Sequence, residues 1–197
     1  LALRGRCRAC GAAIPARSPI VELLGAALAM VAVWHFGPTP QGLAACGFLW
    51  TLLALTFIDA DTQLLPDDLT LPLVWAGLFV NLFGLFVPLA EAVVGAIAGY
   101  LALWTVYWLF KLIRGKEGMG YGDFKLLAAL GAWLGWKALP AIVLLSSVAG
   151  AAIGIALMVA HRRDGGTPLP FGPYLAIAGA TALFVGEPLM RLYLPGQ

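Results

Sequence analysis

The fold is decided by the run CGFLWTLLALTFI, residues Cys46 to Ile58, which carries no charge and is followed by Asp59. A helix that crosses the hydrocarbon core of a bilayer needs about 20 mostly apolar residues, and the apolar residues before Cys46 extend this run toward that length. An ionisable group at membrane depth is costly, so it marks a functional site by default. The run therefore predicts a membrane-spanning helix and makes Asp59 a candidate functional residue.

The composition extends this prediction to the whole chain. Of its 197 residues, 61% are hydrophobic and 11% are charged, and the mean hydropathy is +0.91. An average soluble domain is about 25% charged, and a soluble protein of this size could not bury so much apolar surface. The formal net charge of +2 is too small to indicate a nucleic-acid partner. We expect an all-α membrane helix bundle with the lipid bilayer as its solvent.

Seven membrane-spanning helices are predicted between the polar and Pro/Gly breaks. Their approximate ranges are 19–36, 42–59, 69–88, 91–112, 124–137, 139–160 and 172–190. The fifth is short, and its boundary with the sixth, at Lys137–Pro140, is the least defined. The chain begins at Leu1 inside a basic stretch, which indicates a fragment or a trimmed chain. We expect a remnant of a cytoplasmic segment over 1–17 and one membrane-embedded domain over 18–197.

The basic residues predict the orientation of this bundle. Lys137 and Arg191 fall on one side, and the remaining lysines and arginines fall on the other: Arg4, Arg6, Arg8, Arg17, Lys111, Arg114, Lys116, Lys125, Arg162 and Arg163. Loops rich in Lys and Arg face the cytoplasm. This places the 60–68, 113–123 and 161–171 loops in the cytoplasm, so Asp59 and Asp123 lie at the same membrane face.

The first acidic motif at this face is IDADTQLLPDD, from Ile58 to Asp68. Its plain interpretation is a solvated loop in which Pro66 shapes the turn and Asp68 caps the next helix. That interpretation suits Asp67 and Asp68. It suits Asp59 less well, because a long uncharged run precedes it and crowded, desolvated acids raise one another's pKa.

The second motif is the glycine-rich stretch Gly118-Met119-Gly120-Tyr121-Gly122, which Asp123 follows. Glycines at every second position let the backbone take unusual angles and approach another chain closely. Asp123 is predicted to begin a helix, where ordinary capping of free N–H groups would explain it. A phosphate-binding loop is excluded, because no strand precedes the glycines and no Gly-Lys-Ser/Thr follows them.

The two aspartates admit several functions on these residues alone. Paired carboxyls held close together cannot both ionise easily, and that shared-proton state is how aspartic proteases activate water. A transporter or channel could instead use Asp59, Asp61 and Asp123 to bind a cation or proton, although such sites usually lie nearer mid-span. A structural membrane subunit would use the acids only as helix caps. Whether Asp59 and Asp123 meet in space decides among these alternatives.

A C-x-x-C pair, Cys7-Arg8-Ala9-Cys10, lies in the arginine-rich N-terminal segment. In a reducing compartment such a pair is more often metal-binding or redox-active than a structural disulfide. Zinc normally takes four ligands, and this segment offers two. Cys46 lies at the far end of a predicted span, so it is not a third ligand. The pair is half of a zinc site or it is no site.

Taken together, the motifs resemble those of the type IV prepilin peptidases, the bacterial prepilin leader peptidase/N-methyltransferases. The resemblance covers nearly the whole chain. The Gly-x-Gly-Asp motif alone is short and is shared with presenilin-type and signal-peptide-peptidase-type proteases. It becomes specific together with the other matching stretches: Leu3–Cys10, Pro19–Leu23, Ile58–Asp67, Gly118–Lys125 and Thr167–Tyr174.

The resemblance implies that Asp59 and Asp123 are the catalytic pair of a membrane aspartic endopeptidase. It prefers Asp59 to Asp61 because Asp59 holds the motif position of the family's catalytic aspartate. Asp61 is also about 200° around a helix from Asp59, so both cannot face one partner. Residues near the second aspartate are then implied to form the active-site loop that meets substrate: Gly118, Gly120, Gly122 and Lys125.

The resemblance also implies substrates, cofactors and a location. The enzyme would cleave the leader peptide of type IV prepilins and type II secretion pseudopilins at the cytoplasmic face of the bacterial inner membrane, with no cofactor for proteolysis. For the full-length protein it implies N-methylation of the new N-terminus with S-adenosylmethionine. It further implies a cytoplasmic zinc module with two C-x-x-C pairs, of which this chain holds only Cys7 and Cys10.

Overall fold

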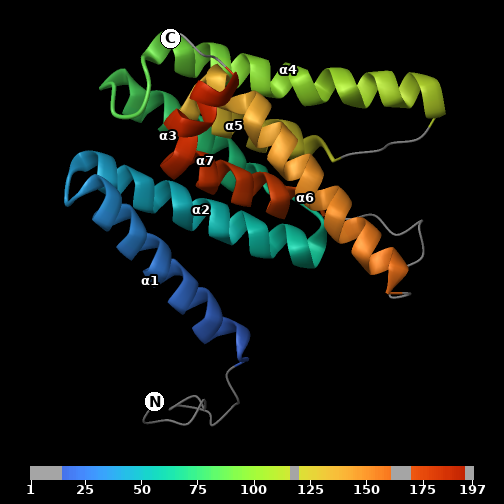
Figure 1. The fold of residues 1–197 in the computed structure, drawn as a ribbon, viewed down its shortest axis with the longest axis horizontal. Coiled ribbons are helices and arrows are strands. Elements are labelled where there is room, and N and C mark those ends of the chain that lie inside the picture. The colour runs from blue at the N-terminus through green and yellow to red at the C-terminus, as the bar shows by residue number, and fades with distance from the viewer. Residues whose placement is uncertain (1–14, 116–119, 161–169, 194–197) are drawn as a thin grey trace. The chain divides into compact units, whose positions relative to one another are not determined.

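The computed structural model describes residues 15–115, 120–160 and 170–193, and all regular elements in these ranges are helical (Figure 1). These ranges hold seven α-helices and one short 3-10 helix, in the order α1 (Arg17–Phe36), α2 (Pro40–Thr62), α3 (Asp67–Leu82), α4 (Leu89–Arg114), α5 (Tyr121–Leu134), η1 (Trp136–Ala138), α6 (Leu139–Val159) and α7 (Gly172–Tyr193). Each predicted span coincides with one α-helix, and the all-α class is confirmed.

Four helical stretches in the described part are long and apolar enough to cross a membrane: α1, α2, α4 and Trp136–Ala156. α3 has 16 residues and α5 has 14, both shorter than the about 20 residues of a straight span. The prediction for the third span, 69–88, was too long, because α3 ends at Leu82. The boundary between the fifth and sixth predicted spans, the least defined in the sequence, is occupied by η1. η1 follows Gly135, whose φ of 77° is a backbone angle that favours glycine.

The chain divides into two compact units, Leu1–Leu53 and Ala54–Gln197. In the first unit, α1 contacts the beginning of α2: the indole N–H of Trp50 donates to the carbonyl oxygen of Gly25 at 2.9 Å. Cys46 is buried there as a free thiol, with Sγ 3.9 Å from the carbonyl oxygen of Ala29. The second unit contains Asp59, Asp123 and every other described residue of the candidate site.

Helix α5 is the centre of the second unit and contacts α3, α4 and α7 (Figure 1). All its residues from Leu126 to Leu134 are buried, as is typical of a helix that is hydrophobic on every side. Its far end is held by Asn81 of α3, whose Nδ2 donates to the carbonyl oxygens of Ala132 at 2.8 Å and Trp133 at 3.0 Å. These bonds satisfy carbonyl groups that the end of a helix leaves without partners.

Glycines allow α4 and α5 to approach backbone to backbone. A Cβ atom at Gly131 of α5 would overlap the carbonyl group of Gly95 on α4, and a Cβ at Gly95 would overlap the carbonyl of Gly131. Small residues at such contacts are the usual means by which membrane helices pack closely. The close contact holds the second half of α5 against α4.

We expect Gly131→Ala to lower the free energy of unfolding by about 3 kcal/mol, because backbone atoms cannot yield to the added methyl group as a flexible side chain could. The matched control is Gly47→Ala, since a Cβ at Gly47 has no neighbour within 4 Å. The control should be neutral or slightly stabilising, because alanine favours a helix over glycine. Thermal unfolding in detergent measures both, and equal midpoints would contradict the close packing.

Candidate active site

Asp59 lies on the last turns of α2 and is buried, with 4% of its surface exposed. The backbone N–H of Gly172, the first residue of α7, donates to Asp59 Oδ2 at 3.0 Å. Asp61, two residues further along the same helix, is exposed. Because α2 continues past Asp59, the two acidic side chains point to different sides of the helix, as their spacing predicts. Only the Asp59 side chain points into the protein.

Asp123 is the third residue of α5 and is also buried, with 7% of its surface exposed. The backbone N–H of Gly120, the N-cap residue, donates to the Asp123 carboxylate. An acid at the third position that bonds back to the N-cap N–H is one half of a capping box. The capping interpretation of Asp123 is thus partly right: it satisfies one N–H group.

The structure brings the two carboxyls into one site, where the charge of Asp59 acts directly on Asp123. Asp123 lies outside the four stretches that are long and apolar enough to cross a membrane. Burial of its carboxyl, reinforced by the charge of Asp59, raises the pKa of Asp123 to about 7, although the N–H of Gly120 opposes the rise. Near neutral pH this carboxyl holds a proton in a substantial share of molecules, so the pair can offer an acid and a base together.

Two glycines allow three chain segments to converge around this pair. A Cβ on Gly122 would lie 2.6 Å from Cβ of Leu65, in the segment after α2. A Cβ on Gly172 would lie 2.7 Å from Asp59 Oδ2. The predicted close approach of the glycine-rich loop is therefore seen at Gly122, whose neighbour is the protein's own chain. Gly118 lies outside the described residues.

Lys125, the fourth residue predicted for the active-site loop, contacts Asp67, which was predicted to lie in a solvated loop. Its Nζ lies 2.6 Å from Asp67 Oδ1 and 2.7 Å from Oδ2. Asp67 and Asp68 both occupy the first turn of α3, and the N-cap residue is Pro66 rather than Asp68. In the sequence, the two residues have opposite charges, are predicted at the same membrane face, and close the motif stretches Ile58–Asp67 and Gly118–Lys125, but nothing there predicts their contact.

The Gly172 N–H is the other contact that sequence analysis did not identify. The Thr167–Tyr174 stretch matches a family motif and is predicted at the cytoplasmic face, as Asp59 is. The donor, however, is a backbone N–H group, which every residue except proline has, so the residue type does not reveal it. Only the position of α7 beside the end of α2 makes Gly172 a partner of Asp59.

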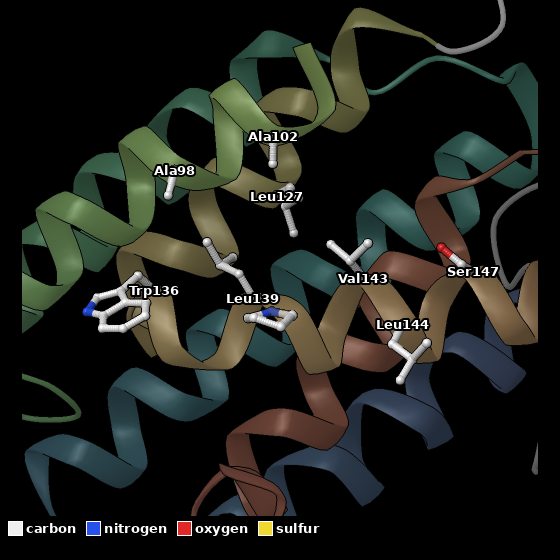
Figure 2. Close-up of a pocket in the computed structure, with 9 residues that line it drawn as sticks. Ala98, Ala102, Leu127, Trp136, Leu139, Val143, Leu144 and Ser147 are labelled. Atoms are coloured by element: carbon white, nitrogen blue, oxygen red, sulfur yellow. The ribbon is translucent and has the colours of Figure 1, made fainter. Parts of the chain in front are cut away.

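Two apolar cavities lie near α4 and α6 but do not include the aspartates. The first has a volume of about 580 Å³, and Figure 2 shows side chains of α4, α5 and α6 converging on it. The second, of about 440 Å³, extends to Pro170 and Phe171, beside Gly172. No carboxyl is among the described residues that line either cavity.

The metal prediction falls on residues outside the described ranges, since Cys7 and Cys10 both precede residue 15. Among residues 15–115, 120–160 and 170–193, no three His, Cys, Asp or Glu side chains gather as metal ligands would. The half zinc site therefore stays a prediction.

Comparison with known proteins gives concordant matches. Residues 46–155 match the type IV leader peptidase family, and residues 1–36 match the bacterial peptidase A24 N-terminal domain. The prepilin leader peptidase/N-methyltransferase of Aeromonas salmonicida is 60% identical over 192 residues, which are 98% of this chain and 66% of that protein. The protein of the same name from Stutzerimonas stutzeri is 57% identical over 194 residues, 98% of this chain and 67% of that protein. No solved structure matches the chain.

Proposed function

Since the chain belongs to the type IV leader peptidase family, we propose that it is a membrane aspartic endopeptidase with Asp59 and Asp123 as its catalytic pair. The family match confirms the resemblance that the sequence motifs indicated. The chain spans about two thirds of the length of the relatives it matches. The observation that carries the proposal is the burial of two carboxyls from distant segments in one site, where one charge acts on the other.

In the proposed mechanism the two carboxyls have different roles. Asp59 is ionised, accepts the Gly172 N–H, and deprotonates a water that attacks the scissile carbonyl carbon. Asp123, whose raised pKa favours its protonated form, gives its proton to the carbonyl oxygen as water adds, which forms a tetrahedral diol. When the diol collapses, the proton that Asp59 took from water passes to the leaving amine, and a hydroxyl of the diol returns a proton to Asp123. Both carboxyls then have their starting protonation states, and the proposed step uses no metal or cofactor.

The names of the relatives support the choice of substrate. Leader peptides of prepilins and pseudopilins are the proposed substrates, cut at the cytoplasmic face of the bacterial inner membrane, where the Lys and Arg bias puts both aspartates. Residues 18–197 are the proposed peptidase domain, after a cytoplasmic segment over 1–17. N-methylation of the product with S-adenosylmethionine, and zinc at Cys7 and Cys10, are proposed for the full-length protein, because the relatives' printed names include N-methyltransferase.

Cleavage by the purified protein tests the proposal. Incubated in detergent or liposomes with a full prepilin precursor, it should release the leader and leave a product whose mass corresponds to one internal cut. A precursor that stays intact under conditions in which a relative cleaves it would contradict the proposed function.

The transporter alternative makes a different prediction in the same liposomes. A protein that uses Asp59, Asp61 and Asp123 as an ion site should carry protons or cations across the membrane without cutting peptide. The family match favours cleavage. Flux that depends on these aspartates, with no cleavage, would reverse the choice.

A further inference from the structure

We propose that Asp67 and Lys125 are positioning residues that hold the two catalytic segments in register. This inference rests on the proposed function, since it concerns the distance between Asp59 and Asp123. We call this ion pair the Asp67–Lys125 clasp. It joins the beginning of α3 to the first turns of α5.

The clasp connects the two segments that bear the aspartates. Asp67 follows Asp59 in the segment that leaves α2, and Lys125 is two residues after Asp123 on α5. Lys125 Nζ contacts both Asp67 oxygens, at 2.6 and 2.7 Å, so the carboxylate is bound through its two atoms. A second contact, between Gly122 and Leu65, lies between the same two segments. Together the two contacts join the segment after Asp59 to residues on both sides of Asp123, Gly122 and Lys125.

The exposure of the clasp indicates a role in position more than in stability. The side chains of Asp67 and Lys125 are 54% and 25% exposed, and ion pairs this accessible contribute little to stability. The remainder of α5 is fixed by its buried contacts with α3 and α4. Asp123 and Lys125 both lie in the first turns of α5, so a contact at Lys125 sets how Asp123 meets Asp59. Small misplacements of reacting groups reduce rates steeply.

The chain supplies matched controls for both members of the clasp. Asp68 occupies the same first turn of α3 and is exposed, so Asp68→Asn removes the same charge from the same helix end. Lys137 forms a similar ion pair with Glu91, at 2.9 Å, by the opposite end of α5. Lys137→Gln therefore breaks an interhelical ion pair of the same kind away from the aspartates.

We expect Asp67→Asn and Lys125→Gln each to lower kcat by about tenfold while KM stays within about twofold, because positioning acts on the chemical step. Asp68→Asn and Lys137→Gln should retain the wild-type kcat. The exchanged pair, Asp67→Lys with Lys125→Asp, should recover most of the activity that either exchange alone removes. Equal kcat in Asp67→Asn and Asp68→Asn, or an exchanged pair no better than the single changes, would overturn the clasp.

Hydrogen exchange of the backbone tests the clasp without any cleavage assay. Amides in 120–126 should exchange faster in Asp67→Asn and Lys125→Gln than in the two controls. Unchanged exchange overturns the clasp even if the wild type cleaves precursor. If the wild type cleaves nothing, the proposed function fails, and exchange still decides whether the clasp holds the first turn of α5.

Discussion

Replacing either Asp59 or Asp123 by asparagine should lower precursor cleavage by about a thousandfold or more, because each carboxyl has a proton-transfer role that an amide cannot perform. Asparagine keeps the size of the side chain and can still accept the N–H of Gly172 or Gly120. The change therefore removes the acid–base function and leaves the local contacts. Mass spectrometry of product formed over time, at equal amounts of folded protein, measures the loss.

The control for this pair of changes is Asp61→Asn. Asp61 is on the same last turns of α2 as Asp59 but is exposed, so its change removes a carboxylate from the same helix end and leaves the buried carboxyl in place. Asp61→Asn should cleave at the wild-type rate. A fully active Asp123→Asn protein would support the structural alternative, since asparagine caps helices about as well as aspartate.

Gly172→Ala is expected to have the second-largest effect, a loss in kcat of about a hundredfold. The added Cβ would lie 2.7 Å from Oδ2 and 3.0 Å from Cγ of Asp59, so the carboxylate must move away. The backbone of Gly172 is not at a positive φ, so alanine adds no backbone strain of that kind there. The loss would come mainly from displacement of Asp59, since the other close neighbour of the added Cβ is the end of the Leu65 side chain, at 3.3 Å.

The matched control on the same helix is Gly186→Ala. A Cβ at Gly186 has no neighbour within 4 Å, so this change tests the effect of one more alanine in α7. The control should be as active as the wild type. Equal rates for Gly172→Ala and Gly186→Ala would show that Gly172 does not position Asp59 for catalysis.

Much of the fold could be predicted because hydropathy is a local property. Each predicted span coincides with a helix, because an apolar run between Pro/Gly breaks can be identified from the residues of that run alone. The third span was predicted too long because 83–88 is also mostly apolar, yet α3 ends at Leu82 and Asn81 accepts the N–H groups of Phe86 and Val87. The end of α3 is accompanied by hydrogen bonds to the Asn81 side chain, and a hydropathy profile cannot predict such bonds.

The sequence by itself determined that this is a helical membrane protein and that Asp59 and Asp123 are its outstanding acids, because the cost of an acid beside an apolar run depends on neighbours in the chain. Only the tertiary structure decided which groups surround them. Gly172 reaches Asp59 across 113 positions and Lys125 reaches Asp67 across 58. Such contacts depend on how α5 and α7 pack against the ends of α2 and α3, and no local pattern records that packing.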